Sequence, residues 1–222
     1  MRLIAALFAL FGTMLVLTGC ANRNQPAPVA GTAPVALPSA PEPTPEDTWV
    51  LELSTGGPVR IQLRPDKAPK HVERIKTLTR RGFYNGLTFH RVIEGFMAQG
   101  GDPMGTGEGG SELPDLEAEF NDLPHVRGVT SMARADEPNS ANSQFFVMLM
   151  PTLRLDNRYT AFGRVLEGMA YVDALPRGEP PAEPGRIVRA WIEADGPPPA
   201  FPAGAPAPAA APPRAPGDAA SR

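Results

Sequence analysis

One continuous stretch of the chain decides the fold, and it reads Phe89-His90-Arg91-Val92-Ile93-Glu94-Gly95-Phe96-Met97-Ala98-Gln99-Gly100-Gly101-Asp102. Its short apolar runs predict two strands, over Thr88–Ile93 and Phe96–Gln99. Because successive side chains of a strand point to opposite faces, His90 and Arg91 should lie on opposite sides of the first strand. We therefore expect the two side chains to contact different parts of the protein.

The residues around this stretch predict a mostly β fold. Thr48–Leu53 and Pro58–Leu63 flank a Gly-containing turn and indicate a hairpin, whose second strand alternates apolar and polar residues. Asp66 is a plausible N-cap for an amphipathic helix that ends near Gly82. A second, short helix should follow Gly168. The remaining predicted strands are Val129–Ala133, Gln144–Leu149, Thr160–Leu166 and Val188–Ile192. Many strands with two helices suggest a closed barrel, because closure removes sheet edges.

Composition places this fold in the middle of the chain. Of the 222 residues, 42% are hydrophobic and 20% charged, which is enough apolar material for a core. Sixteen of the 28 prolines lie in residues 21–46 and 197–222. Such Pro/Ala-rich segments bury too little to offset their ordering entropy, so we expect a linker over 20–46, one domain over 47–196 and a disordered tail over 197–222. The net charge of −3 argues against nucleic acid as a partner.

The N-terminus predicts export. Arg2 precedes an uncharged apolar run over residues 3–17, which is too short for a comfortable membrane span. The run ends in Leu17-Thr18-Gly19-Cys20, which resembles the bacterial lipobox, whose cysteine is acylated and becomes the mature N-terminus. We therefore expect a lipoprotein signal peptide over 1–19 and a periplasm-facing domain anchored to membrane through Cys20. Ala21 favours the outer membrane over the inner one. A plainly cleaved secreted protein and an uncleaved anchor are the alternatives.

The stretch 89–102 closely resembles the signature of the cyclophilin family of peptidyl-prolyl isomerases. Four later segments resemble that family's motifs in the same order: Ser131-Met132-Ala133, Pro138-Asn139-Ser140, Ser143-Gln144-Phe145-Phe146 and Phe162-Gly163. The resemblance covers essentially all of 47–196. It implies a closed eight-stranded antiparallel β-barrel with a helix at each end, a proline-containing polypeptide as substrate, no cofactor and no metal. It also implies a monomer that assists the folding of envelope or exported proteins.

The resemblance also assigns the site. Arg91 is the expected catalytic residue, because a fixed donor aimed at the prolyl nitrogen stabilises only the twisted transition state. The expected substrate-binding residues are Phe96, Met97, Gln99, Ala133, Gln144, Phe146, Leu155 and Tyr159. Two positions depart from the family, since Arg154 stands where a tryptophan is common and Tyr159 where a histidine is common. The first departure puts tight binding of cyclosporin, the family's cyclic-peptide inhibitor, in doubt.

Several other readings compete with an isomerase. The segment Gly105–Gly110 satisfies GxGxxG, but Pro103 and Pro114 flank it, so a loop beside the groove is expected rather than a dinucleotide site. A hydrolase triad of His90, Asp102 and Ser131 lacks a nucleophile elbow. The main rivals are a binding module or chaperone of the same fold with little catalysis, and an envelope scaffold that works through its tail.

Overall fold

An antiparallel hairpin begins the fold of the computed structural model, which describes residues 41–199. Strands β1 (Thr48–Leu53) and β2 (Gly57–Leu63) pair along their whole length, with Trp49 opposite Ile61. The predicted hairpin is confirmed. The predictions for the signal peptide, for Cys20 and for most of the flanking segments concern residues outside the described range.

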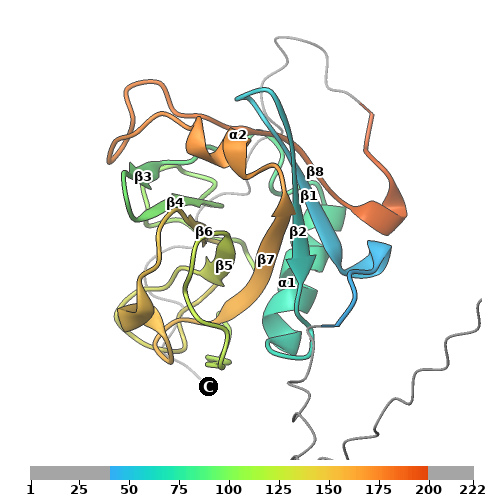
Figure 1. The fold of residues 1–222 in the computed structure, drawn as a ribbon, viewed down its shortest axis with the longest axis vertical. Helices are drawn as coiled ribbons and strands as arrows, with labels where there is room; N and C mark the ends of the chain where they lie inside the picture. Colours follow the sequence, from blue (N-terminus) through green and yellow to red (C-terminus); the bar gives the residue numbers. More distant parts are fainter. Residues whose placement is uncertain (1–40, 200–222) are drawn as a thin grey trace, which may run out of the picture. The chain divides into compact units, whose positions relative to one another are not determined.

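Within the described residues the hairpin belongs to one eight-stranded sheet, which curls around a core (Figure 1). All of its strand pairs are antiparallel, and their order is β3-β4-β6-β5-β7-β2-β1-β8. The other six strands are β3 (Arg91–Ile93), β4 (Met97–Gly100), β5 (Val129–Met132), β6 (Phe145–Met148), β7 (Ala161–Glu167) and β8 (Ile187–Ile192). The predicted strands exist, and most of their ends shift by one to three residues.

The expected closure of the barrel is not present in the strand order. Strands β3 and β8 are the two edges of an open, curled sheet. No ladder joins them; the isolated bridges Val92–Gly178 and Thr88–Arg186 and a few backbone hydrogen bonds, such as Phe89 N–H to the Gly185 carbonyl, link residues near them. The segment between α2 and β8 carries Pro176, Pro180, Pro181 and Pro184. Proline has no backbone N–H to donate, so this segment cannot extend a ladder along β3.

Two α-helices and three 3-10 turns complete the described part of the fold. Helix α1 (Pro69–Arg80) contacts β8 and buries the apolar face that was predicted, whereas α2 (Met169–Asp173) contacts β2. Asp66 is not the N-cap: Ala68 holds that position, and the Asp66 carboxylate binds Arg64 at 2.7 Å. The 3-10 turns are η1 (Pro45–Asp47), η2 (Leu153–Leu155) and η3 (Glu193–Asp195). No helix among residues 41–199 is long and apolar enough to cross a bilayer.

Trp49 lies at the centre of the core. It is fully buried, and its ring meets Tyr84 and Phe145 edge-on at centroid distances of 5.1 and 4.9 Å. A second, smaller apolar cluster forms separately, and its buried members are Met97, Val129, Phe146, Met148, Leu155 and Ala161. Strand alternation explains the division, because Ala98 and Val147 enter the main core while their neighbours Met97 and Phe146 enter the second cluster.

Candidate active site

The second cluster contains six of the predicted site residues. Met97 and Phe146 are almost fully buried on neighbouring strands, and Leu155 joins them from η2. Their partly buried neighbours Phe96, Ala133 and Tyr159 pack against the same cluster. The rings of Phe146 and Tyr159 meet edge-on at 5.6 Å. We call these six residues the apolar socket, after the role that the resemblance predicts for them; the structure places all six in or against one apolar cluster.

Arg91 lies on the same sheet as the socket, at the first position of β3. It pairs across the strands with Gln99, which in turn pairs with Phe146. The Arg91 side chain is 40% exposed, and its Nε donates to Glu179 Oε2 at 2.6 Å. Glu179 is held there because the preceding Gly178 exchanges two backbone hydrogen bonds with Val92, at 2.8 and 2.9 Å. The carboxylate therefore fixes one edge of the guanidinium, and no described side chain is hydrogen-bonded to its Nη groups.

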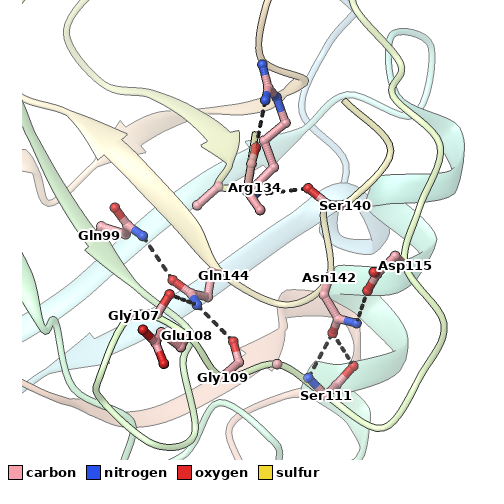
Figure 2. A pocket seen from close by; sticks show the side chains of 13 residues that line it. Gln99, Gly107, Glu108, Gly109, Ser111, Asp115, Arg134, Ser140, Asn142 and Gln144 are labelled. Atoms are coloured by element: carbon pink, nitrogen blue, oxygen red, sulfur yellow. Dashed lines mark hydrogen bonds between the residues drawn. The ribbon is translucent and has the colours of Figure 1, made fainter. Parts of the chain in front are cut away.

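Gln99 and Gln144 belong to a chain of side-chain hydrogen bonds (Figure 2). Gln99 Nε2 donates to Gln144 Oε1 at 2.9 Å, and Gln144 Nε2 donates to the carbonyls of Gly107 and Gly109. With Ala133 they line a pocket of about 470 Å³, whose lining also includes Glu108, Asp115, Arg134, Ser140 and Asn142. The predicted substrate-binding residues thus divide between an apolar socket and an adjacent polar pocket.

The glycine-rich segment is a loop, as predicted. Asp102 organises it by accepting from the backbone N–H groups of Met104, Thr106 and Gly107 at 2.6–2.8 Å. No helix begins within residues 101–128, so the geometry that a dinucleotide site requires is absent from this part of the chain. Instead the loop presents its carbonyls to Gln144, which explains why it lies beside the groove.

The conceivable hydrolase triad is excluded by the partners of its members. Ser131 Oγ bonds His125 Nε2 at 2.9 Å, and His125 Nδ1 bonds Asp156 Oδ1 at 2.8 Å. Ser131 is fully buried, so no substrate reaches its hydroxyl. Both ring nitrogens of His90 are buried without a hydrogen-bond partner in the described structure, and burial lowers its pKa.

The Ser131–His125–Asp156 chain is a feature that sequence reasoning missed. The His125 ring stacks on Phe146 with centroids 6.2 Å apart and an interplanar angle of 25°. The chain therefore supports the floor of the socket from below. Residues at 125, 131 and 156 match no spacing rule, and only the fold brings them together.

Two arginines lie over aromatic rings at the rim of the socket. The Cζ atom of Arg154 is 5.8 Å from the centroid of Phe96, and that of Arg134 is 4.7 Å from the centroid of Tyr159. Both distances are in the range of cation–π contacts. Arg154, which departs from the family pattern, thus still covers a socket residue, but with a cation instead of an indole.

Comparisons with known proteins agree on one family. The family model described as "Cyclophilin type peptidyl-prolyl cis-trans isomerase/CLD" matches residues 50–191. A probable peptidyl-prolyl cis-trans isomerase of Brucella suis is 47% identical over 176 residues, covering 72% of this chain and 89% of its own. The fold is similar to a crystal structure of the cyclophilin AquaCyp293 from Hirschia baltica, with 32% identity, a TM-score of 0.64 and coverage of 69% and 76% of the two chains.

A second solved structure carries information on ligands. A cyclophilin-type isomerase of Cryptosporidium parvum, solved in the presence of the dipeptide Ala-Pro, is 28% identical with a TM-score of 0.61. The match covers 65% of this chain and 98% of that one.

Proposed function

The chain belongs to the cyclophilin-type peptidyl-prolyl cis-trans isomerases, and from this we propose that Arg91 is the residue that accelerates rotation about the X–Pro bonds of its substrates. The observation that carries the proposal is the position of Arg91 at the edge of the socket, exposed and held at Nε by Glu179. A second part of the proposal concerns where the enzyme works: at the bacterial cell envelope, on exported proteins.

The chemistry follows from the electronic structure of the amide. Rotation about X–Pro faces a barrier of about 18–20 kcal/mol, because the nitrogen lone pair is delocalised into the carbonyl. The twisted transition state loses that delocalisation, so the prolyl nitrogen becomes a hydrogen-bond acceptor only there. A guanidinium Nη–H of Arg91 aimed at this nitrogen stabilises the transition state and leaves the planar ground state alone. No proton is transferred and no covalent bond forms.

The socket has the complementary task of holding the proline ring while the peptide group turns. Phe96, Met97, Phe146 and Leu155 offer apolar surface, and Tyr159 adds a ring with a polar tip. Gln99, whose amide nitrogen is engaged by Gln144, keeps a carbonyl oxygen for the substrate backbone. The relative solved in the presence of Ala-Pro supports a proline-containing peptide as the ligand of this groove.

Isomerisation of a prolyl peptide by the full-length protein tests the catalytic assignment. Arg91→Ala should lower kcat/KM by about 10²–10³-fold, the loss that follows removal of one preorganised donor. Arg164→Ala is the control, because Arg164 is an arginine of the same sheet, on β7, and belongs to neither the socket nor the polar pocket. Near-wild-type turnover of a folded Arg91→Ala protein would favour the alternative of a binding groove in which Arg91 plays no catalytic part.

The envelope location rests on the lipobox-like segment Leu17–Cys20 after a short apolar run. We propose that Cys20 is acylated, that the mature protein begins there, and that it faces the periplasm, at the outer membrane rather than the inner one. Mass spectrometry of the native N-terminus checks this, with a Cys20→Ser variant as the control. An unmodified mature N-terminus at any other residue would contradict it.

A further inference from the structure

Three arginines without a carboxylate partner, Arg134, Arg154 and Arg158, belong to segments that carry residues of the apolar socket, whereas Arg74, Arg164 and Arg186 of residues 41–199 also contact no carboxylate but lie elsewhere. Most arginines and lysines of residues 41–199 contact an aspartate or glutamate. Arg154 and Arg158 do not, although both are exposed and lie on one short segment. Arg134 completes the group: it donates to backbone carbonyls, including that of Arg158, and to no carboxylate.

Two of these arginines, Arg154 and Arg134, lie over aromatic rings of the apolar socket. Arg154 covers the ring of Phe96 and precedes the socket residue Leu155 in η2. Arg158 precedes Tyr159, whose ring Arg134 covers. A peptide with its proline in the socket would therefore carry its neighbouring side chains past exposed guanidinium groups.

The nearest carboxylate in sequence makes no ion pair with either Arg154 or Arg158. Asp156 lies between Arg154 and Arg158, but its Oδ1 accepts from both the backbone N–H and the ring of His125, at 2.8 Å each. The carboxylates of Glu108 and Asp115 belong to the polar pocket, where Gln99 and Gln144 lie. Arg154 thus places a cation beside η2 without a carboxylate partner, whereas the adjacent pocket is lined by Glu108 and Asp115 together with Arg134.

We propose that Arg154 and Arg158 form a subsite for an acidic side chain, so that the enzyme prefers prolines with Asp or Glu within two residues on one side. The proposal rests on the proposed function of the socket. Opposite charges placed along a groove favour one class of partner and disfavour its charge-reversed counterpart. Because both arginines are exposed, the expected preference is modest, about 3- to 10-fold, and depends on ionic strength.

The test compares peptides that differ by one isosteric charge. Each carries a single Glu or a single Gln at one of the two positions before or the two positions after the proline. Both kcat/KM and the peptide affinity, from fluorescence anisotropy, are measured with the full-length protein at low salt. We expect the Glu peptide to be favoured about 3- to 10-fold on one side of the proline, and the ratio to approach one at about 0.5 M NaCl, where charges are screened within roughly 4 Å.

Substitution of the two arginines tests whether they form the subsite. The double variant Arg154→Gln/Arg158→Gln should bring the Glu-to-Gln ratio close to one, with circular dichroism as the control for folding. Arg164→Gln should keep the ratio, because Arg164 lies on β7 and belongs to neither the socket nor the polar pocket. Equal turnover of Glu and Gln peptides at all four positions, or a preference that survives in the double variant, would overturn the proposal. Absence of turnover on every peptide would instead contradict the isomerase itself.

Discussion

On the proposed mechanism, the contact between Arg91 and Glu179 matters for chemistry and hardly at all for stability. Their side chains are 40% and 53% exposed, and exposed pairs of this kind stabilise a fold by about 0–1 kcal/mol. The contact nevertheless fixes the plane of the guanidinium, and preorganised donors stabilise a transition state without reorganisation. The motif around Arg91 could be identified in the sequence, whereas Glu179 could not. It lies 88 residues away, in a proline-rich loop whose path only the fold determines.

His90 should make stability depend on pH. Its buried ring has a pKa below the ordinary value of about 6.5, so the unfolded chain binds a proton more readily than the folded one. The free energy of unfolding should therefore be fully retained above about pH 7 and fall as the pH drops through 6.5. Burial lowers the pKa of His71 in the same direction. Urea titrations from about pH 7.5 to 5.5 measure the slope.

The variant His90→Leu should have a shallower slope over that range, whatever its absolute stability, because only His71 remains of this pair. A slope as steep as that of the wild type would show that His90 does not supply the pH dependence.

At the level of elements, the alternation of apolar and polar residues made the strands predictable, whereas contacts with neighbouring segments set where each strand begins and ends. The predicted strand Thr88–Ile93 begins only at Arg91, because Phe89 N–H already donates to the Gly185 carbonyl outside any ladder. Socket and core residues of β4 and β6 separate by the alternation of strand side chains. The socket residues were nevertheless predicted from the resemblance to the cyclophilins and not from this alternation. The open sheet could not be predicted from the sequence. Closure depends on the segment that lies between the edge strands β3 and β8, and that segment is a proline-rich loop.

Gly168, between β7 and α2, is the position where replacing glycine by alanine should lower the stability of the fold most. It precedes α2 at φ 88°, and an added Cβ would lie 2.3 Å from the Pro58 carbonyl oxygen and 2.8 Å from the Cα of Val59. Gly168→Ala should destabilise the protein by roughly 2–4 kcal/mol, from strain and overpacking together. Gly95 is the control, because it has φ 68° and nothing within 4 Å of its added Cβ. Gly95→Ala should cost about 1–2 kcal/mol, from strain alone.

Chemical denaturation of both variants checks this prediction. Equal losses at the two glycines would mean that the β2–α2 contact relaxes to accommodate the methyl group.

On the scale of the whole molecule, charged side chains join the beginning and the end of the described domain. Arg80 of α1 contacts both Glu46 of η1 and Asp195 of η3, at 2.9 and 2.8 Å. Glu46 lies just outside the domain of 47–196 that composition predicts. Fragments 41–199 and 47–196 should both fold and catalyse, and the longer one should melt a few degrees higher, since each exposed pair contributes up to about 1 kcal/mol.

Calorimetry of the two fragments measures this difference. Glu46→Gln in the longer fragment should remove most of it, because Glu46 contacts both Arg80 and Lys76. A shorter fragment that is folded but more than about tenfold slower would show that a flank contributes to the site.

The most direct measurement compares the effect of Arg91 on binding of the planar peptide with its effect on the rate of isomerisation, which depends on the twisted transition state. Arg91→Ala and Arg91→Lys are titrated with a prolyl peptide and assayed for isomerisation, with circular dichroism as the control for folding. Arg91→Ala should lose about 10²–10³-fold in kcat/KM while the peptide affinity changes only a few-fold, because the nitrogen accepts a hydrogen bond only when twisted. Arg91→Lys should recover part of the rate, since an ammonium lacks the fixed plane. Parallel losses in affinity and turnover, or full turnover in a folded Arg91→Ala protein, would contradict the assignment of Arg91 as the transition-state donor.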